Sequence, residues 1–163
     1  MEKSKKRLVV FIPSIEDGGV EKNLFLILNY ISKKIGFIDL ITFDNKNNYK
    51  FSKKINIINP LLNFSFFSSR KPKYILCLIT LMLKLIINRN YLLLSFQANI
   101  YVIILAKIFN VQVISRSNSS SIGWSKNPLK QIIFSFFFKK ANKILVNSYD
   151  FKNEMDKKYN INS

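Results

Sequence analysis

The chain has 163 residues, with 26 Lys or Arg against 9 Asp or Glu, a net charge of +17. This length suits one domain with a core of its own, and an apolar content of 48% argues against a disordered chain. No histidine occurs, so zinc sites and His-based acid–base catalysis within the chain are excluded or very strained.

Hydrophobic patterning predicts strands that alternate with helices. The first apolar run is continuous, which is typical of a strand covered on both faces, as in a parallel sheet. In chain order we expect a strand at 7–14, a helix at 19–34, strands at 37–43 and 55–58, a helix at 73–88, a strand at 91–96, a helix at 97–109, a strand at 111–116, a helix at 128–141, a strand at 143–147 and a helix from 149.

Local signals support several of these boundaries. Gly36 is a suitable C-cap for the first helix. Asn127 followed by Pro128 is a favourable start for the helix at 128–141. Ser148 can cap the last helix, with Asp150 in its first turn. The alternation predicts an α/β fold, a Rossmann-like and mostly parallel sheet sandwiched by helices, in one domain over residues 1–163.

Two of the four glycines stand side by side, Gly18 and Gly19, between the first strand and the first helix. Glycine permits positive φ and removes the Cβ that would block a ligand, and a strand–turn–helix of this kind can cradle a phosphate. The G-x-G-x-x-G and G-x-x-x-x-G-K-[ST] patterns are both missing, so a plain tight turn is the alternative.

No transmembrane helix is expected. The run at 74–87 has about 14 residues and contains Lys84, and the run at 91–109 is broken by Ser95, Gln97 and Asn99, whereas a spanning helix needs about 20 apolar residues. We interpret both runs as buried elements. The single cysteine, Cys77, lies in the first of them and is expected to act as a small buried hydrophobe.

The nine acids lie near the two ends of the chain, and none occurs between Asn45 and Tyr149. A surface this basic attracts polyanions such as nucleic acid or anionic lipid headgroups. The alternative is that the excess charge serves solubility alone.

Three segments, taken in order, resemble the N-terminal domain of the family 4 retaining glycosyltransferases, which have the GT-B fold. They are IPSIEDGGVEKNLFLILNYISKK, LLLSFQANIYVIILAKIFNVQVISRSNSSSIGW and KKANKILVNSYDFKNEM. The resemblance implies the acceptor-side domain of an enzyme that transfers sugar from a nucleotide-sugar donor. It also implies an acceptor that is a glycan or lipid-linked, in cell-surface polysaccharide or glycolipid synthesis.

The resemblance implies which residues contact the substrate or the donor phosphates. The candidates are Gly18, Gly19, Ser95, Arg116 and Ser148. For Arg116 the alternative is a solvated loop arginine, and for Ser148 it is helix capping. Glu21 matches a family glutamate, but we favour the role of an acid at a helix N-terminus.

The chain departs from the family at two points. Many relatives carry a histidine at the end of the fourth strand, where this chain has Ser95-Phe96-Gln97, so the role of that histidine is not carried over. The family's C-terminal domain, which supplies most of the sugar-nucleotide site, is not expected within these 163 residues, so that domain or a separate chain would have to supply it. The catalytic residues are therefore unknown, and we expect no sugar transfer by this chain alone.

Neither a metal nor a cofactor is expected beyond the nucleotide-sugar substrate. The Asp-x-Asp motif with which GT-A enzymes hold a metal does not occur, and the adjacent Glu16 and Asp17 make a poor cage. Without histidine the usual serine-hydrolase triad is impossible.

The basic and aromatic segment at 126–143 allows three interpretations. It can press on an anionic membrane, bind nucleic acid, or pack its apolar residues in the core with lysines at the rim. The predicted membrane contacts are Lys126, Lys130, Phe136, Phe137, Lys139 and Lys140. A transferase domain, peripheral on the cytoplasmic face of the membrane, is the first function class, and nucleic acid is the less favoured partner. A noncatalytic basic module that binds anionic membrane or nucleic acid is the second class.

Overall fold

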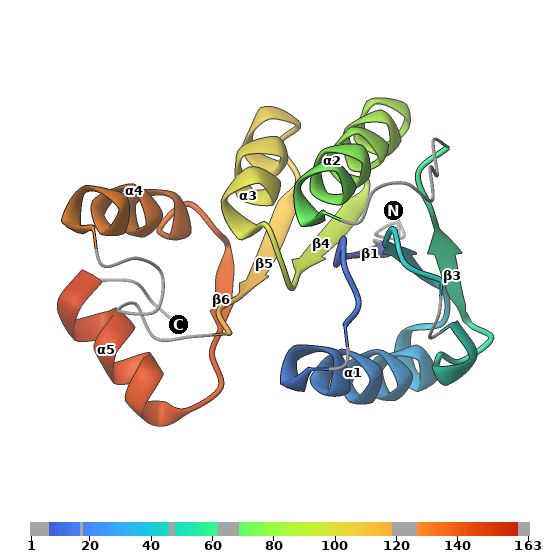
Figure 1. The fold of residues 1–163 in the computed structure, drawn as a ribbon, viewed down its shortest axis with the longest axis horizontal. Coiled ribbons are helices and arrows are strands. Elements are labelled where there is room, and N and C mark those ends of the chain that lie inside the picture. Colours follow the sequence, from blue (N-terminus) through green and yellow to red (C-terminus); the bar gives the residue numbers. More distant parts are fainter. Residues whose placement is uncertain (1–6, 17, 46–47, 62–68, 119–126, 160–163) are drawn as a thin grey trace, which may run out of the picture.

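The computed structural model describes residues 7–16, 18–45, 48–61, 69–118 and 127–159. Strands and helices alternate along most of the chain (Figure 1). In chain order the elements are β1 (Arg7–Phe11), α1 (Gly19–Ile35), β2 (Ile38–Ile41), the 3₁₀ turn η1 (Asn48–Lys50), β3 (Ile55–Ile58), α2 (Arg70–Ile87), β4 (Tyr91–Ser95), α3 (Asn99–Ile108), β5 (Gln112–Arg116), α4 (Pro128–Phe138), β6 (Lys143–Leu145) and α5 (Tyr149–Tyr159).

The six strands form one parallel sheet in the order β3-β2-β1-β4-β5-β6. Val10 of β1 lies in register between Leu40 of β2 and Leu94 of β4. The predicted α/β, Rossmann-like fold is thereby confirmed. The strand order reverses direction between β1 and β4, and in sheets of this kind ligands bind at the carboxyl ends of the strands near such a reversal.

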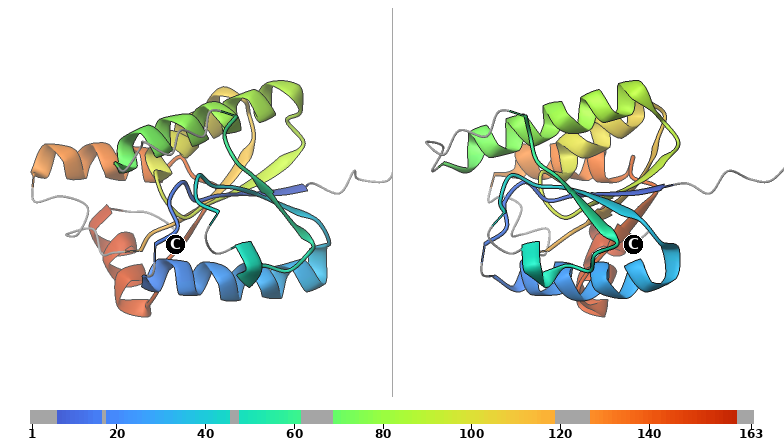
Figure 2. Two further views of the ribbon diagram at one scale, coloured as in Figure 1. Left: turned by 45° about the vertical axis from the view of Figure 1, so that its right-hand side comes forward. Right: turned by 90° about the vertical axis from the view of Figure 1, so that its right-hand side faces the viewer.

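Two layers of helices cover the sheet. Helices α1 and α5 lie on one face, and α2, α3 and α4 lie on the other (Figures 1 and 2). Each layer has its own core: Leu24 and Leu28 of α1 pack on one face of the sheet, and Leu81 and Leu85 of α2 pack on the other. Because strand side chains alternate between faces, both sides of the central strands are apolar, as the continuous runs in the sequence predicted.

Several predicted boundaries are confirmed. Gly36 ends α1 with φ 79°, and the Asn127 side chain accepts hydrogen bonds from the amides of Leu129 and Lys130 at the start of α4. Helix α2 begins three residues before the predicted start, because Pro72 sits within its first turn, where a missing N–H costs nothing.

The interpretation of the runs at 74–87 and 91–109 as buried elements is wrong for one side of α2 and one side of α3. In α3, Tyr101 and Ile108 are 60% and 67% exposed. One stripe of α2, which includes Cys77, is fully buried, but the opposite stripe, which includes Ile75, is exposed, because the sheet covers only one side of the helix. In the described part of the chain no helix combines the length and the apolar character that crossing a bilayer requires.

Cys77 itself is fully buried, as expected, and burial raises the pKa of its thiol to about 12.

Candidate functional site

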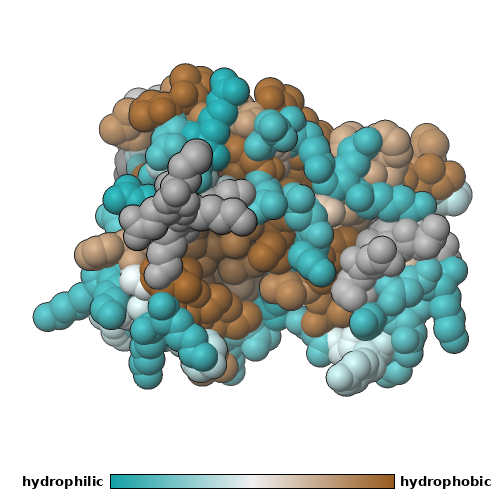
Figure 3. All heavy atoms as spheres, turned by 180° about the vertical axis from the view of Figure 1, so that it is seen from behind, coloured by the Kyte–Doolittle hydropathy of each residue, from teal (hydrophilic) through white to brown (hydrophobic). Residues whose placement is uncertain are grey.

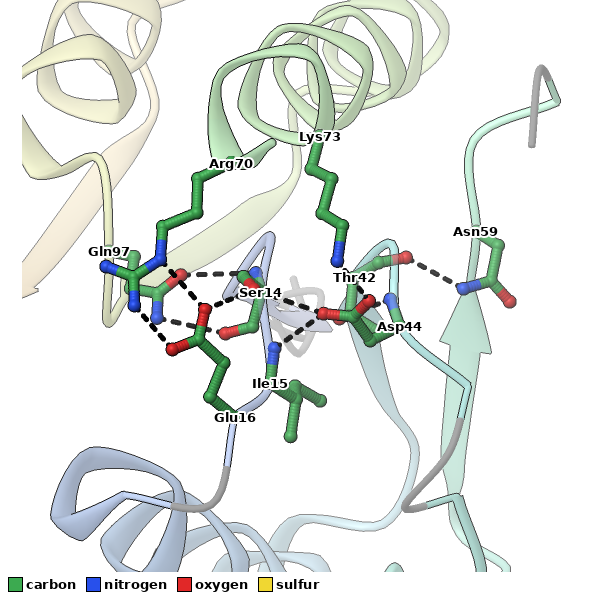
Figure 4. Close-up of polar contacts among 9 residues, drawn as sticks. All are labelled: Ser14, Ile15, Glu16, Thr42, Asp44, Asn59, Arg70, Lys73 and Gln97. Atoms are coloured by element: carbon green, nitrogen blue, oxygen red, sulfur yellow. Dashed lines mark hydrogen bonds and ion pairs between the residues drawn. The ribbon is translucent and has the colours of Figure 1, made fainter. Parts of the chain in front are cut away.

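A network of polar side chains joins the loops at the carboxyl ends of β1, β2 and β4 (Figure 4). Gln97, just after β4, pairs with the backbone of Ser14, just after β1. The side-chain oxygen Oε1 of Gln97 accepts a hydrogen bond from the backbone N–H of Ser14 at 3.2 Å. Its side-chain nitrogen Nε2 donates to the backbone carbonyl of Ser14 at 2.9 Å. This two-bond bridge spans the point at which the strand order reverses, so it fixes the two loops that border the expected ligand crevice.

Asp44, which follows β2, anchors the same region. One carboxylate oxygen accepts from the Ile15 amide at 2.9 Å and from the Ser14 hydroxyl at 3.2 Å. The other oxygen accepts from Lys73 Nζ of α2 at 2.7 Å, and both side chains are about one-fifth exposed. Since its oxygens already hold a loop and a helix, Asp44 is a positioning group for this edge of the sheet.

Glu16 and Arg70 complete the network at its solvent side. The Arg70 Nε donates to one Glu16 oxygen at 2.8 Å, and Nη2 donates to the other oxygen. The Arg70 hydrogen bond holds the pKa of the Glu16 carboxyl below its usual value. Both side chains are at least half exposed, so the pair adds little stability, but it ties the loop before α1 to the start of α2.

These network residues were not predicted to form a site. A usable signal was present: Asp44 follows the apolar run of β2 and Gln97 follows that of β4. Residues directly after the strands of a parallel sheet converge at one edge.

Gly18 and Gly19 lie at the start of α1, and neither adopts the positive φ that glycine permits. Gly18 has φ −120°, and the one positive-φ glycine in the described residues is Gly36. A Cβ on Gly18 would lie 2.7 Å from Oε2 of Glu21, whereas one on Gly19 would meet open space. Gly18 therefore makes room for the Glu21 carboxylate. Glu21 is 6% exposed and lies in the first turn of α1, where the helix dipole stabilises a negative charge.

Ser95 is fully buried at the end of β4. Its hydroxyl donates to the side-chain Oδ1 of Asn99 at 2.5 Å and lies 3.1 Å from the backbone carbonyl of Gln97. The side-chain nitrogen Nδ2 of Asn99 in turn donates to the backbone carbonyl of Arg116 at 2.7 Å. Between them Ala98 adopts the left-handed conformation, φ 53°, as the N-cap of α3, where it supplies no capping side chain. Ser95 thus holds the turn that leads into α3.

Arg116, at the carboxyl end of β5, is 4% exposed, so the alternative of a solvated loop arginine is wrong. Its Nη2 donates to Asn147 at 2.8 Å and its guanidinium lies over the Phe96 ring at 5.1 Å. Its Nη1 is buried and has no hydrogen-bond partner among the residues that the structure describes. In the described part of the chain no carboxylate pairs with it, and burial lowers its pKa. A buried cation without a counter-ion is costly, and an anion would relieve that cost.

A cavity of about 750 Å³ opens between α3 and α4 beside this edge. Its polar lining residues include Gln97, Asn118 and Lys130, and the rest of its lining is mainly aliphatic and aromatic, with Ile104 and Phe137. Tyr74 lines it as well and donates to Gln97 at 3.3 Å, and burial raises the pKa of its hydroxyl. A cavity lined by a few polar groups and a mainly apolar wall suits a small amphiphilic ligand.

The five predicted substrate contacts are not part of the lining of this cavity. None of Gly18, Gly19, Ser95, Arg116 and Ser148 lines it. Ser148 borders a smaller pocket of about 340 Å³ at the end of β6, and its hydroxyl caps α5 by accepting from the Phe151 amide at 3.3 Å.

The predicted membrane contacts in and beside α4 differ in their exposure to solvent. Phe136 and the lysines 130, 139 and 140 are exposed, and Phe137 is half-buried against the cavity. Lys126 lies outside the described residues. The interpretation of this segment as core alone is wrong for Phe136, Ile132 and Ile133, which are 55%, 65% and 44% exposed.

Comparison with known structures gives the fold a name. Anabaena Alr3699/HepE, in complex with UDP and glucose, matches with a TM-score of 0.65 at 10% identity over 92% of this chain and 40% of that chain. The fold is that of one half of a GT-B glycosyltransferase. Glycyrrhiza uralensis UGT73P12, complexed with glycyrrhetinic acid 3-O-monoglucuronide, matches with 0.65 at 10% identity over 97% and 48% of the two chains. The lipopolysaccharide outer core galactosyltransferase WaaB matches with 0.52 at 16% identity over 92% and 41%.

The chain thus spans less than half the length of these glycosyltransferases. No protein-family model and no curated protein matches the sequence. The similarity to GT-B glycosyltransferases is structural, and membership of family 4 stays a prediction.

Proposed function

We propose that residues 1–163 form the N-terminal, acceptor-side domain of a nucleotide-sugar-dependent glycosyltransferase of family 4. The observation that carries this proposal is the amphiphilic cavity of about 750 Å³ at the carboxyl edge of a sheet with the GT-B half fold. A glycan or lipid-linked acceptor has the matching chemistry, a polar sugar beside an apolar group.

In this proposal the donor is held mainly by a second domain or chain, because the matched glycosyltransferases are more than twice as long as this chain. This domain would contribute contacts to the donor phosphates or the acceptor through Gly18, Gly19, Ser95, Arg116 and Ser148. Nη1 of Arg116, which has no hydrogen-bond partner within the described ranges, supports a role with an anion. The polar network of Ser14, Asp44 and Gln97 would set the shape of the edge without taking part in chemistry.

The first test measures turnover by the purified 163-residue chain. With UDP-glucose as the probe donor and octyl glucoside as the probe acceptor, we expect no transfer, and detectable transfer would contradict the division of labour between two domains.

The second test asks whether the cavity takes an acceptor. Octyl glucoside should shift the NMR signals of residues that line it, such as Ile104 and Phe137. Ile133→Trp should fill the cavity and weaken binding about tenfold, whereas Ile132→Trp, one residue away but outside the cavity, should bind as the wild type does. Equal binding by both variants would remove the cavity from the proposal.

The net charge of +17 supports a second function class, a noncatalytic basic module that binds anionic membrane or nucleic acid. A single-stranded dT20 oligonucleotide should not displace octyl glucoside. Tight dT20 binding with a steep salt dependence, together with no binding of octyl glucoside, would favour that class.

A further inference from the structure

The outer faces of α2, α3 and α4 carry an unusual number of exposed apolar side chains. On α2 they recur every three or four residues and so form one stripe along the helix. Ten of them are Ile75, Ile79, Leu83 and Ile86 on α2, Tyr101 and Ile108 on α3, and Leu129, Ile132, Ile133 and Phe136 on α4, each between 44% and 67% exposed. The eleventh, Ile87 at the end of α2, is 86% exposed.

These three faces join into one surface. A groove of about 250 Å³ between α2 and α3 is lined only by apolar and tyrosine side chains, among them Ile79 and Met82. Tyr101 and Ile104 of α3 line both this groove and the larger cavity beside α4. Seen from behind, apolar side chains crowd the upper rim over these helices, whereas polar side chains prevail along the lower rim (Figure 3).

Every charged residue on this layer is basic, because no acid occurs between Asn45 and Tyr149. The exposed lysines on and beside the three helices are Lys71, Lys107, Lys130, Lys139 and Lys140. None of them pairs with a carboxylate in the described part of the chain. Lys140 instead lies over the ring of Phe136 at 4.5 Å. An apolar centre with a wholly cationic rim complements a bilayer that contains anionic lipid.

We propose that the outer faces of α2, α3 and α4 form one lipid-facing surface that seats the chain on an anionic bilayer. This extends the membrane contact predicted for residues 126–143 to two further helices, and it does not depend on sugar transfer. A second copy of the chain is a poor occupant because two surfaces of equal positive charge repel each other. Nucleic acid is a poor occupant because nine of the eleven exposed apolar side chains are aliphatic and offer no stacking platform.

The test is co-sedimentation of the full chain with vesicles of phosphatidylcholine, with and without one-quarter phosphatidylglycerol, at 0.1 and 0.5 M salt. Two double variants probe the surface, Ile75→Glu with Ile86→Glu on α2, and Ile132→Glu with Phe136→Glu on α4. The matched control, Leu26→Glu with Tyr30→Glu, makes the same charge change at exposed positions of α1 in the opposite layer.

Binding of the wild type should require phosphatidylglycerol and weaken in high salt. Each surface variant should lose about tenfold in partition coefficient, while the control stays within about twofold; circular dichroism checks that all variants fold. An α2 variant that binds as the wild type does would overturn the extension beyond α4. A wild-type dimer that becomes a monomer in the α2 variant would show that a second copy occupies the surface and would also overturn it.

Discussion

The two helical layers are built alike on the inside and differently on the outside. Each presents fully buried leucines to the sheet, such as Leu24 in α1 and Leu81 in α2. All the acids that lie in helices belong to α1 and α5, whereas α2, α3 and α4 have none. The comparison teaches that inner packing specifies the fold, while the outer composition of each layer is free to serve a separate purpose.

The largest expected effect concerns the shared feature, inner packing. Leu81→Ala in α2 and Leu24→Ala in α1 should each lower the free energy of unfolding by about 2–5 kcal/mol, because each removes a fully buried side chain. Urea denaturation measures both. A loss below about 1 kcal/mol in one variant alone would show that its layer is not packed as described.

The next effect concerns the link between the α2–α4 layer and the loops of the sheet. Asp44→Asn should lower the free energy of unfolding by about 1–3 kcal/mol, because it weakens three charged contacts, to Ser14, Ile15 and Lys73. Glu16→Gln, in the exposed pair with Arg70, is the control and should stay close to the wild type. The opposite ranking would mean that the exposed pair holds this edge together.

A smaller effect is expected when the side chain that caps one helix in each layer is removed. Asn127→Ala removes two bonds at the start of α4 and should cost about 1 kcal/mol. Ser148→Ala removes one bond of 3.3 Å at the start of α5 and should cost about half as much. Thermal unfolding of the two variants measures the difference, and an equal or reversed cost would contradict the capping geometry.

The smallest effect is a pH dependence that arises inside the α2–α4 layer. Burial raises the pKa of Cys77 from 9.0 to about 12. Between these values the unfolded chain releases the thiol proton while the folded chain keeps it, so stability should fall as pH rises. The loss should be under about 1 kcal/mol at pH 9.5 relative to pH 8, and Cys77→Ala should remove that part of the slope. An unchanged slope in this variant would show that the thiol is accessible in the folded chain.

The order of strands and helices could be predicted from the sequence because each strand is a short apolar run and each helix repeats its apolar residues at helical spacing. The polar network could not, since Ser14 and Gln97 are 83 residues apart and only the parallel sheet brings them together. The outer stripe of α2 was misjudged for a related reason. A residue such as Ile79 has the same hydropathy whether the sheet or the solvent faces it, and sequence alone does not say which.

At Ala98, the stability of the turn before α3 and the access to the cavity favour different side chains. A left-handed backbone at this position would suit asparagine or glycine better than alanine. Yet Ala98 lines the cavity beside Gln97 and Asn99, where a longer side chain would narrow the opening. Replacing Ala98 by asparagine would therefore gain stability at this turn but reduce the access of small molecules to the cavity.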